Sequence, residues 1–361
     1  MNKISTRQLC FFLAAIAPLG KIILLPTNLV HYAKNDLLFP AAMNFILQAA
    51  VVFLVLLLAK HNKSFYELVA DKLGHVAAKI ILSLFALFFF FAAVMPLVEQ
   101  KLFVQSVFYD TLPSIAAFSS FFVFSAYLCA KPLASFSRTW DILAPLAIVA
   151  FAGILFFSLQ TVDFGALSPA LQSGGKGIFN GFLYSMSWFF DTAILLSFLG
   201  KIDYKKGLPW KGLLAYLAGA AGVMLFLAIF YGVFEDIAIN QEFAFTKIAR
   251  YFSGIETLGR FDYLFIFALA LVMAFYAILP LQAGIDFIRQ CFGSRQKRFL
   301  PEILSVIVNV VMLVLTILLD YRYQMLNETV SVKLFWIFPV FALLLPVLAL
   351  LLKIRRQREN E

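Results

Sequence analysis

Two charged residues, Lys21 and Asp191, lie deep inside long apolar stretches of the sequence. A charged side chain at the centre of a bilayer costs roughly 2.5 to 3.5 kcal/mol, so both should face a helix-bundle interior or a cavity. We expect Lys21 to lie beside a substrate site, where it either meets a substrate carboxylate or pairs with Asp191. Protonation of Asp191 would then couple to transport. The alternatives are a purely structural ion pair and a lysine whose stem reaches toward the membrane surface.

Both charges follow residues that interrupt helices. In the first stretch, APLGKIILLPTN, proline removes a backbone hydrogen bond and glycine allows unwinding. The second stretch opens with SGGKGIFNG and continues through polar and aromatic residues. Backbone N–H and C=O groups freed at such breaks can hold a carboxylate or a cation. The predicted substrate-binding residues are Pro18, Leu19, Gly20, Lys21, Tyr184, Ser185, Ser187, Trp188 and Asp191.

These assignments have simpler alternatives. Both breaks are also compatible with ordinary kinks, and the aromatic side chains around Trp188 either close over an amphipathic ligand or pack against neighbouring helices. Other charges near helix ends are expected to be structural. We expect Glu99 and Lys101 at the outer interface as solvated or paired charges, and Asp286 to pair with Arg289 near the inner interface.

Other kinds of site lack the residues they need. The stretch GGKG does not have the spacing of a phosphate-binding loop, and His31, His61 and His75 are scattered without metal-ligand spacing. No motif of a hydrolase or metalloprotease is present, so we expect neither an enzyme nor a cofactor or metal site. The three cysteines form no CxxC pair and are expected to be free thiols.

The elements that position these residues are membrane-spanning helices. Of the 361 residues, 63% are hydrophobic and only 14% are charged, whereas soluble domains carry about 25% charge. Basic residues occur in short clusters between apolar stretches rather than along one face, which argues against nucleic acid as a partner. The apolar segments are residues 8–30, 37–59, 79–100, 114–130, 140–160, 177–200, 212–234, 261–288, 301–319 and 333–352. We therefore predict an all-α membrane protein of about ten transmembrane helices in a single membrane domain, 1–361.

Lysine and arginine predict the orientation, because cytoplasmic loops retain them. With ten helices, twenty basic residues fall on one side and eight on the other. This distribution places both termini in the cytoplasm.

Two long connectors suggest an internal repeat. Residues 61–77 and 235–257 mix apolar and charged residues at helical spacing, follow helices two and seven, and fall on opposite faces. Two inverted five-helix repeats, residues 1–160 and 177–353, would produce this arrangement, with helices one and six corresponding and both broken. Two unrelated loops are the alternative.

The sequence resembles the B subunit of spore germinant receptors, within the amino acid–polyamine–organocation transporter superfamily. The stretches that carry the resemblance are ILLPTNLVHYAKNDLLFPA, SFYELVADKLGHVAAKIILSLF, VDFGALSPALQSGGKGIFNGF and FTKIARYFSGIETLGRFDYLFIFALALVMAFY. The resemblance implies a LeuT-like 5+5 fold with a germinant site, commonly for an amino acid, around the breaks in helices one and six. It also implies a location in the spore inner membrane and two partners, a larger membrane subunit and a lipoprotein subunit.

Three functions follow as hypotheses. The first is a receptor subunit that senses a small amino acid. The second is a proton-coupled amino acid permease of the same fold, in which Lys21 or Asp191 changes protonation. The third is a membrane scaffold with a vestigial site.

Overall fold

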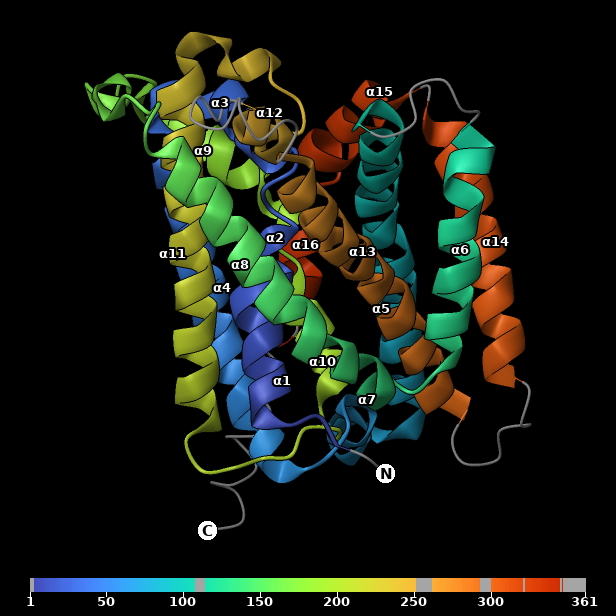
Figure 1. The fold of residues 1–361 in the computed structure, drawn as a ribbon. Helices are drawn as coiled ribbons and strands as arrows, with labels where there is room; N and C mark the ends of the chain where they lie inside the picture. The colour runs from blue at the N-terminus through green and yellow to red at the C-terminus, as the bar shows by residue number, and fades with distance from the viewer. Residues whose placement is uncertain are drawn as a thin grey trace.

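Every predicted apolar segment overlaps a helix in the computed structural model (Figure 1). The structure describes residues 3–107, 114–250, 262–292, 300–320, 322–344 and 346. These residues form helices joined by short connectors, and their one isolated β-bridge joins Ile4 to Ile202. The long apolar helices are α4 (Leu38–Leu58), α5 (Phe65–Val107), α6 (Ser114–Ala130), α8 (Trp140–Ser158), α11 (Leu208–Phe234), α13 (Asp262–Phe292) and α14 (Leu300–Asp320).

Seven described helices are long and apolar enough to cross a membrane by themselves, and a bent pair makes an eighth candidate. Shorter apolar helices over Thr6–Leu19 and Phe118–Ala130 account for the first and fourth predicted segments. An integral membrane protein with the predicted all-α architecture is therefore confirmed.

The predicted first helix is interrupted in its middle. It consists of α1 (Thr6–Phe11), a π-helical turn η1 (Phe12–Ile16), α2 (Ala17–Leu19) and, after a non-helical stretch, α3 (Leu25–Ala33). Pro26 occupies one of the first two positions of α3, where the missing N–H has no partner to lose. Pro18 lies near the end of the continuous helical stretch Thr6–Leu19, just before the helix stops.

The predicted sixth helix is interrupted in the same way. Helix α9 (Gly174–Tyr184) is followed by a 3-10 turn, η6 (Met186–Trp188), two non-helical residues, and α10 (Asp191–Phe198). In Figure 1, the junctions of α2 with α3 and of α9 with α10 both fall inside the bundle. Both predicted breaks are therefore present.

The last helix differs from its prediction. Helical structure begins at α15 (Tyr323–Glu328) and continues through η10 (Thr329–Lys333), about ten residues earlier than the apolar run suggested. A bend of 54° then separates it from α16 (Ile337–Pro339) and η11 (Val340–Leu344). The apolar run did not predict this start, because the first turns contain polar residues such as Asn327 and Ser331. These two side chains hydrogen-bond to each other within the protein.

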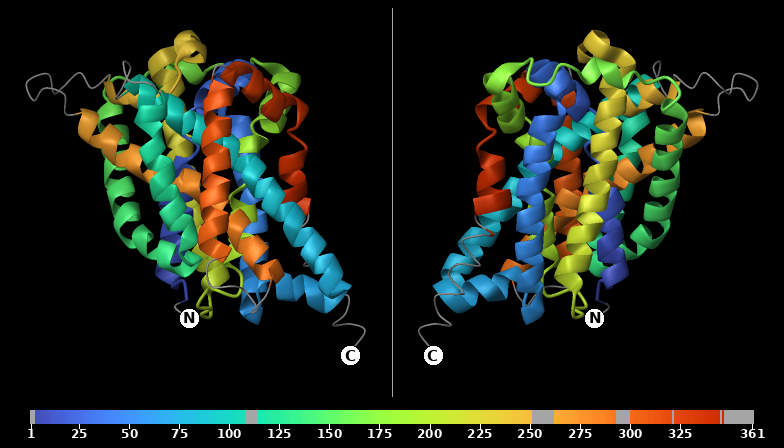
Figure 2. Two further views of the ribbon diagram at one scale, coloured as in Figure 1. Left: turned by 90° about the vertical axis from the view of Figure 1, so that its right-hand side faces the viewer. Right: turned by 90° about the vertical axis from the view of Figure 1, so that its left-hand side faces the viewer.

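The first long connector forms the beginning of α5. Its helix departs from helical geometry at Gly74, whose φ of 84° is accessible to glycine at little cost. Figure 2 shows the preceding turns running across the lower end of the bundle before the long, tilted part of α5 begins. The second connector contains η7 (Glu235–Asn240) and α12 (Ala244–Arg250), and its predicted end at 251–257 lies outside the described residues.

Helix α13 is at the centre of the packing. It lies against α5, α6, α8 and α10. Within its most apolar stretch, 72% is buried inside the protein, compared with 22% for α14. Helix α11 packs on α4 and on the first helix. Close approach there depends on Gly219, where a Cβ would lie 2.5 Å from Pro18 Cγ. The two broken helices are thereby enclosed by α4, α5, α11 and α13.

Polar contacts tie the lower end of the bundle, where the chain begins (Figure 1). Ile4 exchanges backbone hydrogen bonds with Lys201 and Asp203, at 2.8 and 2.9 Å. Lys201 forms an ion pair with Asp286, while Arg289 donates to the carbonyls of Cys129 and Ala130. The predicted pairing of Asp286 with Arg289 is therefore wrong, because the guanidinium is drawn to the carbonyl end of α6.

Candidate functional site

An ion pair between Lys21 and Asp191 joins the two helix breaks. The Lys21 ammonium donates to Oδ2 of Asp191, and both side chains are fully buried. Each charge lies at the helix end that favours it: Lys21 follows α2 and also donates to Ala17 O at 3.2 Å, while Asp191 is the first residue of α10. The ring of Phe189 lies 5.1 Å from the ammonium. Of the alternatives that the sequence left open for Lys21, this structure shows pairing with Asp191.

Tyr276 of α13 also belongs to this group, and it was not among the residues predicted from the sequence. Its hydroxyl donates to Asp191 Oδ1 at 3.0 Å. A Cβ at Gly20 would lie 2.3 Å from the tyrosine ring, so the ring occupies the space that the glycine leaves. Besides its predicted role in flexibility, Gly20 thus allows Tyr276 to pack closely against the first helix.

Two amide side chains on α4 bind the backbone of the sixth-helix break. Asn44 Nδ2 donates to Phe182 O at 3.0 Å and to Ser185 Oγ at 2.9 Å. One turn further along, Gln48 donates to the carbonyl of Phe189 and accepts from the Tyr216 hydroxyl at 2.8 Å. These carbonyls already have donors, so the side chains of Lys21 and Asp191 are the stronger candidates for contacting a solute.

Ser185 and Tyr184 serve mainly to hold the break in place. Ser185 is buried, and its hydroxyl donates to Gly181 O at 2.6 Å. Tyr184 is half-buried and packs its ring against Tyr32 and Phe335, with centroids 5.0 and 5.8 Å away. Neither contacts the ion pair through a hydrogen bond in this structure, and Tyr184 matches the packing alternative.

Ser187 and Trp188 each contact a polar side chain of another helical segment. The Ser187 hydroxyl lies 3.3 Å from that of Ser331 in η10, and the Trp188 indole donates to Glu99 Oε1 at 3.2 Å. Glu99 is only 2% exposed. Glu99 is thus neither solvated nor, within the described residues, in an ion pair, so the expectation of a solvated or paired charge is wrong for Glu99, which α5 places beside the sixth-helix break.

The site is closed in this structure. The cavity beside the sixth-helix break, lined in part by Asn44, Gln48 and Phe189, measures about 10 Å³, which is room for about one water molecule. Pro18 and Leu19 line a separate apolar cavity of about 250 Å³ between the first helix, α8 and α11. A small solute would thus reach the ion pair only after side chains or helices move.

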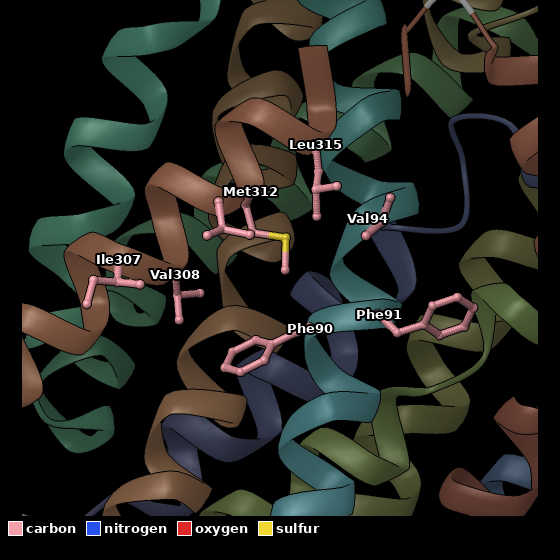
Figure 3. Close-up of a pocket in the computed structure, with 8 residues that line it drawn as sticks. Phe90, Phe91, Val94, Ile307, Val308, Met312 and Leu315 are labelled. Atoms are coloured by element: carbon pink, nitrogen blue, oxygen red, sulfur yellow. The ribbon is translucent and has the colours of Figure 1, made fainter. Parts of the chain in front are cut away.

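A larger cavity among the described residues lies away from this site. This groove of about 380 Å³ separates α5 from α14, and Figure 3 shows Phe90 on the side of α5 that faces Val308 and Met312, whereas Phe91 points the other way. All its lining residues are apolar. It offers no group to a charged ligand and is not part of the candidate site.

The arrangement of two broken helices around a buried ion pair defines the class of protein, a permease-like integral membrane protein with a LeuT-like fold. A solved structure of a substrate-bound, outward-open Na⁺-coupled sialic acid symporter matches it with a TM-score of 0.55 and 9% sequence identity, covering 94% of this chain and 78% of that chain. A likeness at this identity concerns the fold alone. Residues 3–323 match the family model described as spore germination protein, so the chain belongs to that family. No curated protein matches the chain significantly.

Proposed function

We propose that this chain is the amino-acid-binding integral membrane subunit of a spore germinant receptor. The observation that carries the proposal is the fully buried Lys21–Asp191 pair between the two helix breaks. A buried ion pair is weak evidence for stability, because an apolar replacement is often as stable, and ionisable groups within a membrane usually serve a function. Membership of the spore germination family supports the sensing role.

In the proposed mechanism, the carboxylate of a small amino acid replaces Asp191 as the partner of Lys21. The ammonium keeps a charged partner throughout, so the exchange avoids leaving it bare in a low dielectric. Asp191 retains the Tyr276 hydroxyl as a hydrogen-bond partner during the exchange and takes up a proton, because a buried carboxylate without a cation is costly. The other proposed binding residues, including Gly20, Ser187 and Trp188, form the surroundings of this exchange.

The signal would pass by rocking one bundle against the other, with 1–160 and 177–353 as the two inverted repeats. Because the cavity in the closed state holds about one water molecule, binding requires a different arrangement of the breaks. A ligand that binds this arrangement more tightly shifts the population toward it. A larger membrane subunit and a lipoprotein subunit would receive the signal in the spore inner membrane, with both termini of this chain in the cytoplasm.

A proton-coupled amino acid permease is the second candidate. The observation that favours it is the fold, since the similar solved structure is a coupled symporter. Here the Lys21–Asp191 pair would change protonation during a transport cycle. A scaffold with a vestigial site would explain the closed cavity but would not explain why charged residues are buried there.

Binding and uptake separate these functions. The purified chain in lipid nanodiscs is screened with each of the twenty standard amino acids by thermal shift, and proteoliposomes are tested for uptake of labelled forms of those that bind. Binding without uptake supports the receptor, and binding with pH-dependent uptake supports the permease. Neither binding nor uptake would contradict both and leave the scaffold.

A further inference from the structure

Glu99 is a buried carboxylate that forms no ion pair within the described residues. It lies toward the C-terminal end of α5, is 2% exposed, and in the same part of the chain has a single hydrogen bond, from the neutral Trp188 indole. The neighbouring Lys101 lies two positions along the helix, and side chains at this spacing point in different directions. No ion pair to Glu99 occurs in the described part of the chain.

Two buried carboxylates flank the sixth-helix break. Asp191 forms an ion pair with Lys21, whereas Glu99 accepts a hydrogen bond from the Trp188 indole and forms no ion pair within the described residues. An unpaired carboxylate in an apolar interior is costly, so this position favours a bound cation.

A row of polar side chains leads toward Glu99. Half-buried Asn327 in α15 accepts from Ser331 at 2.9 Å, and Ser331 lies 3.3 Å from Ser187, the neighbour of Trp188. Ser331 belongs to the π-helical turn η10, and such turns are frequent at functional sites. The row begins at the end of the bundle that holds α15, the upper end in Figure 1. These side chains place hydrogen-bonding groups for a polar solute between otherwise apolar helices.

We propose that Glu99 binds the ammonium group of the amino acid ligand. This inference rests on the proposed function and deepens it, because Lys21 would contact the carboxylate and Glu99 the amine of one zwitterion. An ammonium carries three donors for carboxylate and hydroxyl oxygens, and the Trp188 ring adds a cation–π surface. Divalent metals need more oxygen ligands than one carboxylate supplies, and the described residues contain no group of three acidic, histidine or cysteine side chains around a common point.

The test uses Glu99→Gln in the full chain, with Glu302→Gln on the exposed face of α14 as the matched control. The probes are the amino acid that most stabilises the wild type in the thermal-shift screen, its deaminated carboxylic acid, ethylamine, and Na⁺ and K⁺ salts. Dissociation constants are measured in nanodiscs. Glu99→Met, which keeps the volume without charge, is the second variant if Glu99→Gln does not fold.

The expected result is selective loss of amine recognition. Glu99→Gln should bind the amino acid about 10- to 100-fold more weakly, bind the deaminated acid as the wild type does, and no longer be stabilised by ethylamine. Glu302→Gln should behave as the wild type throughout. Unchanged amino acid affinity in Glu99→Gln would overturn the inference, as would Glu99-dependent stabilisation by Na⁺ or K⁺ without any by ethylamine.

The two proposals fail in distinguishable ways. If no amino acid binds the wild type but ethylamine stabilises it through Glu99, the proposed function is wrong and the cation site stands. If the amino acid binds equally to both proteins, the function stands and the role of Glu99 is wrong. If neither compound stabilises the wild type, both are contradicted.

Discussion

At the scale of single residues, three buried charges lie around the two helix breaks. Lys21 and Asp191 neutralise each other, Tyr276 donates to the carboxylate, and Trp188 donates to Glu99. Stability alone does not require this arrangement, since apolar side chains of similar volume would pack as well. In the proposed function, these charges mark the position where a charged solute is exchanged.

Removing one charge of the pair should be more harmful than removing both. Lys21→Met leaves Asp191 buried without its cation and should lower the free energy of unfolding by about 3 to 5 kcal/mol. The double variant Lys21→Met/Asp191→Leu should recover most of that loss and still fail to bind an amino acid. Thermal unfolding in detergent measures the first effect, with exposed Lys60→Met as the control. A double variant no more stable than Lys21→Met would contradict this account.

The sequence identifies some of these residues and not others. Lys21 and Asp191 were predictable because a charged side chain within an apolar run must face the bundle interior or a cavity. Glu99 was misplaced because it lies near the end of its apolar segment, and the length and tilt of α5 are not visible in composition. Tyr276 was missed because tyrosine is unremarkable in an apolar helix, and only the fold places it against Gly20.

At the scale of elements, α4 stabilises the interruption of the sixth helix. Its Asn44 and Gln48 are four residues apart and so lie on one face, where they bind the backbone and the Ser185 hydroxyl at the break. Two amides at this spacing within an apolar helix are a signal in the sequence for such a role. A break in a membrane helix needs such partners, because lipid offers none.

Gln48→Leu tests this role of α4. The change leaves the Phe189 carbonyl without its side-chain donor and the buried Tyr216 hydroxyl without its acceptor. Unfolding should become easier by roughly 1 to 3 kcal/mol for an unsatisfied group, and the melting temperature reports it. The same change at exposed Gln172 is the control. Equal melting temperatures for both variants would show that the break does not depend on Gln48.

Helix positions were predictable where apolar runs are continuous, as for α4, α11 and α14. Proline and glycine also predicted the breaks in the first and sixth helices. The start of the last helix was not predictable, since Asn327 and Ser331 make its first turns look like a loop. Their hydrogen bonds are satisfied within the protein, which hydropathy does not record.

At the scale of the whole molecule, Asp36 connects the two proposed repeats at the upper end. It lies between α3 and α4 in η2 (Lys34–Asp36) and accepts from Leu171 N at 2.6 Å and from Ser173 N and Oγ at 2.8 and 2.7 Å. Burial raises the pKa of Asp36, but the hydrogen bonds from Ser173 and Leu171 outweigh it, so the pKa lies below its usual 3.8. The ionised carboxylate thus holds the segment that leads into the sixth helix.

This shift predicts acid sensitivity. A carboxyl group with a lowered pKa in the folded state contributes stability above its unfolded pKa and loses it as the pH falls through the folded value. The wild type should therefore lose stability below about pH 4 in part through Asp36, and Asp36→Asn should show a smaller loss over the same range. Melting temperatures measured from pH 6 to pH 3 give both curves, with exposed Asp236→Asn as the control. Parallel wild-type and Asp36→Asn curves would contradict the role.

The central claim is that an amino acid carboxylate takes the place of Asp191 at Lys21. A structure of the chain in nanodiscs with the most stabilising amino acid bound tests it directly. The account predicts the ligand between the two helix breaks, with its carboxylate within hydrogen-bond distance of Lys21 Nζ. An amino acid bound elsewhere, with the Lys21–Asp191 pair unchanged, would contradict it.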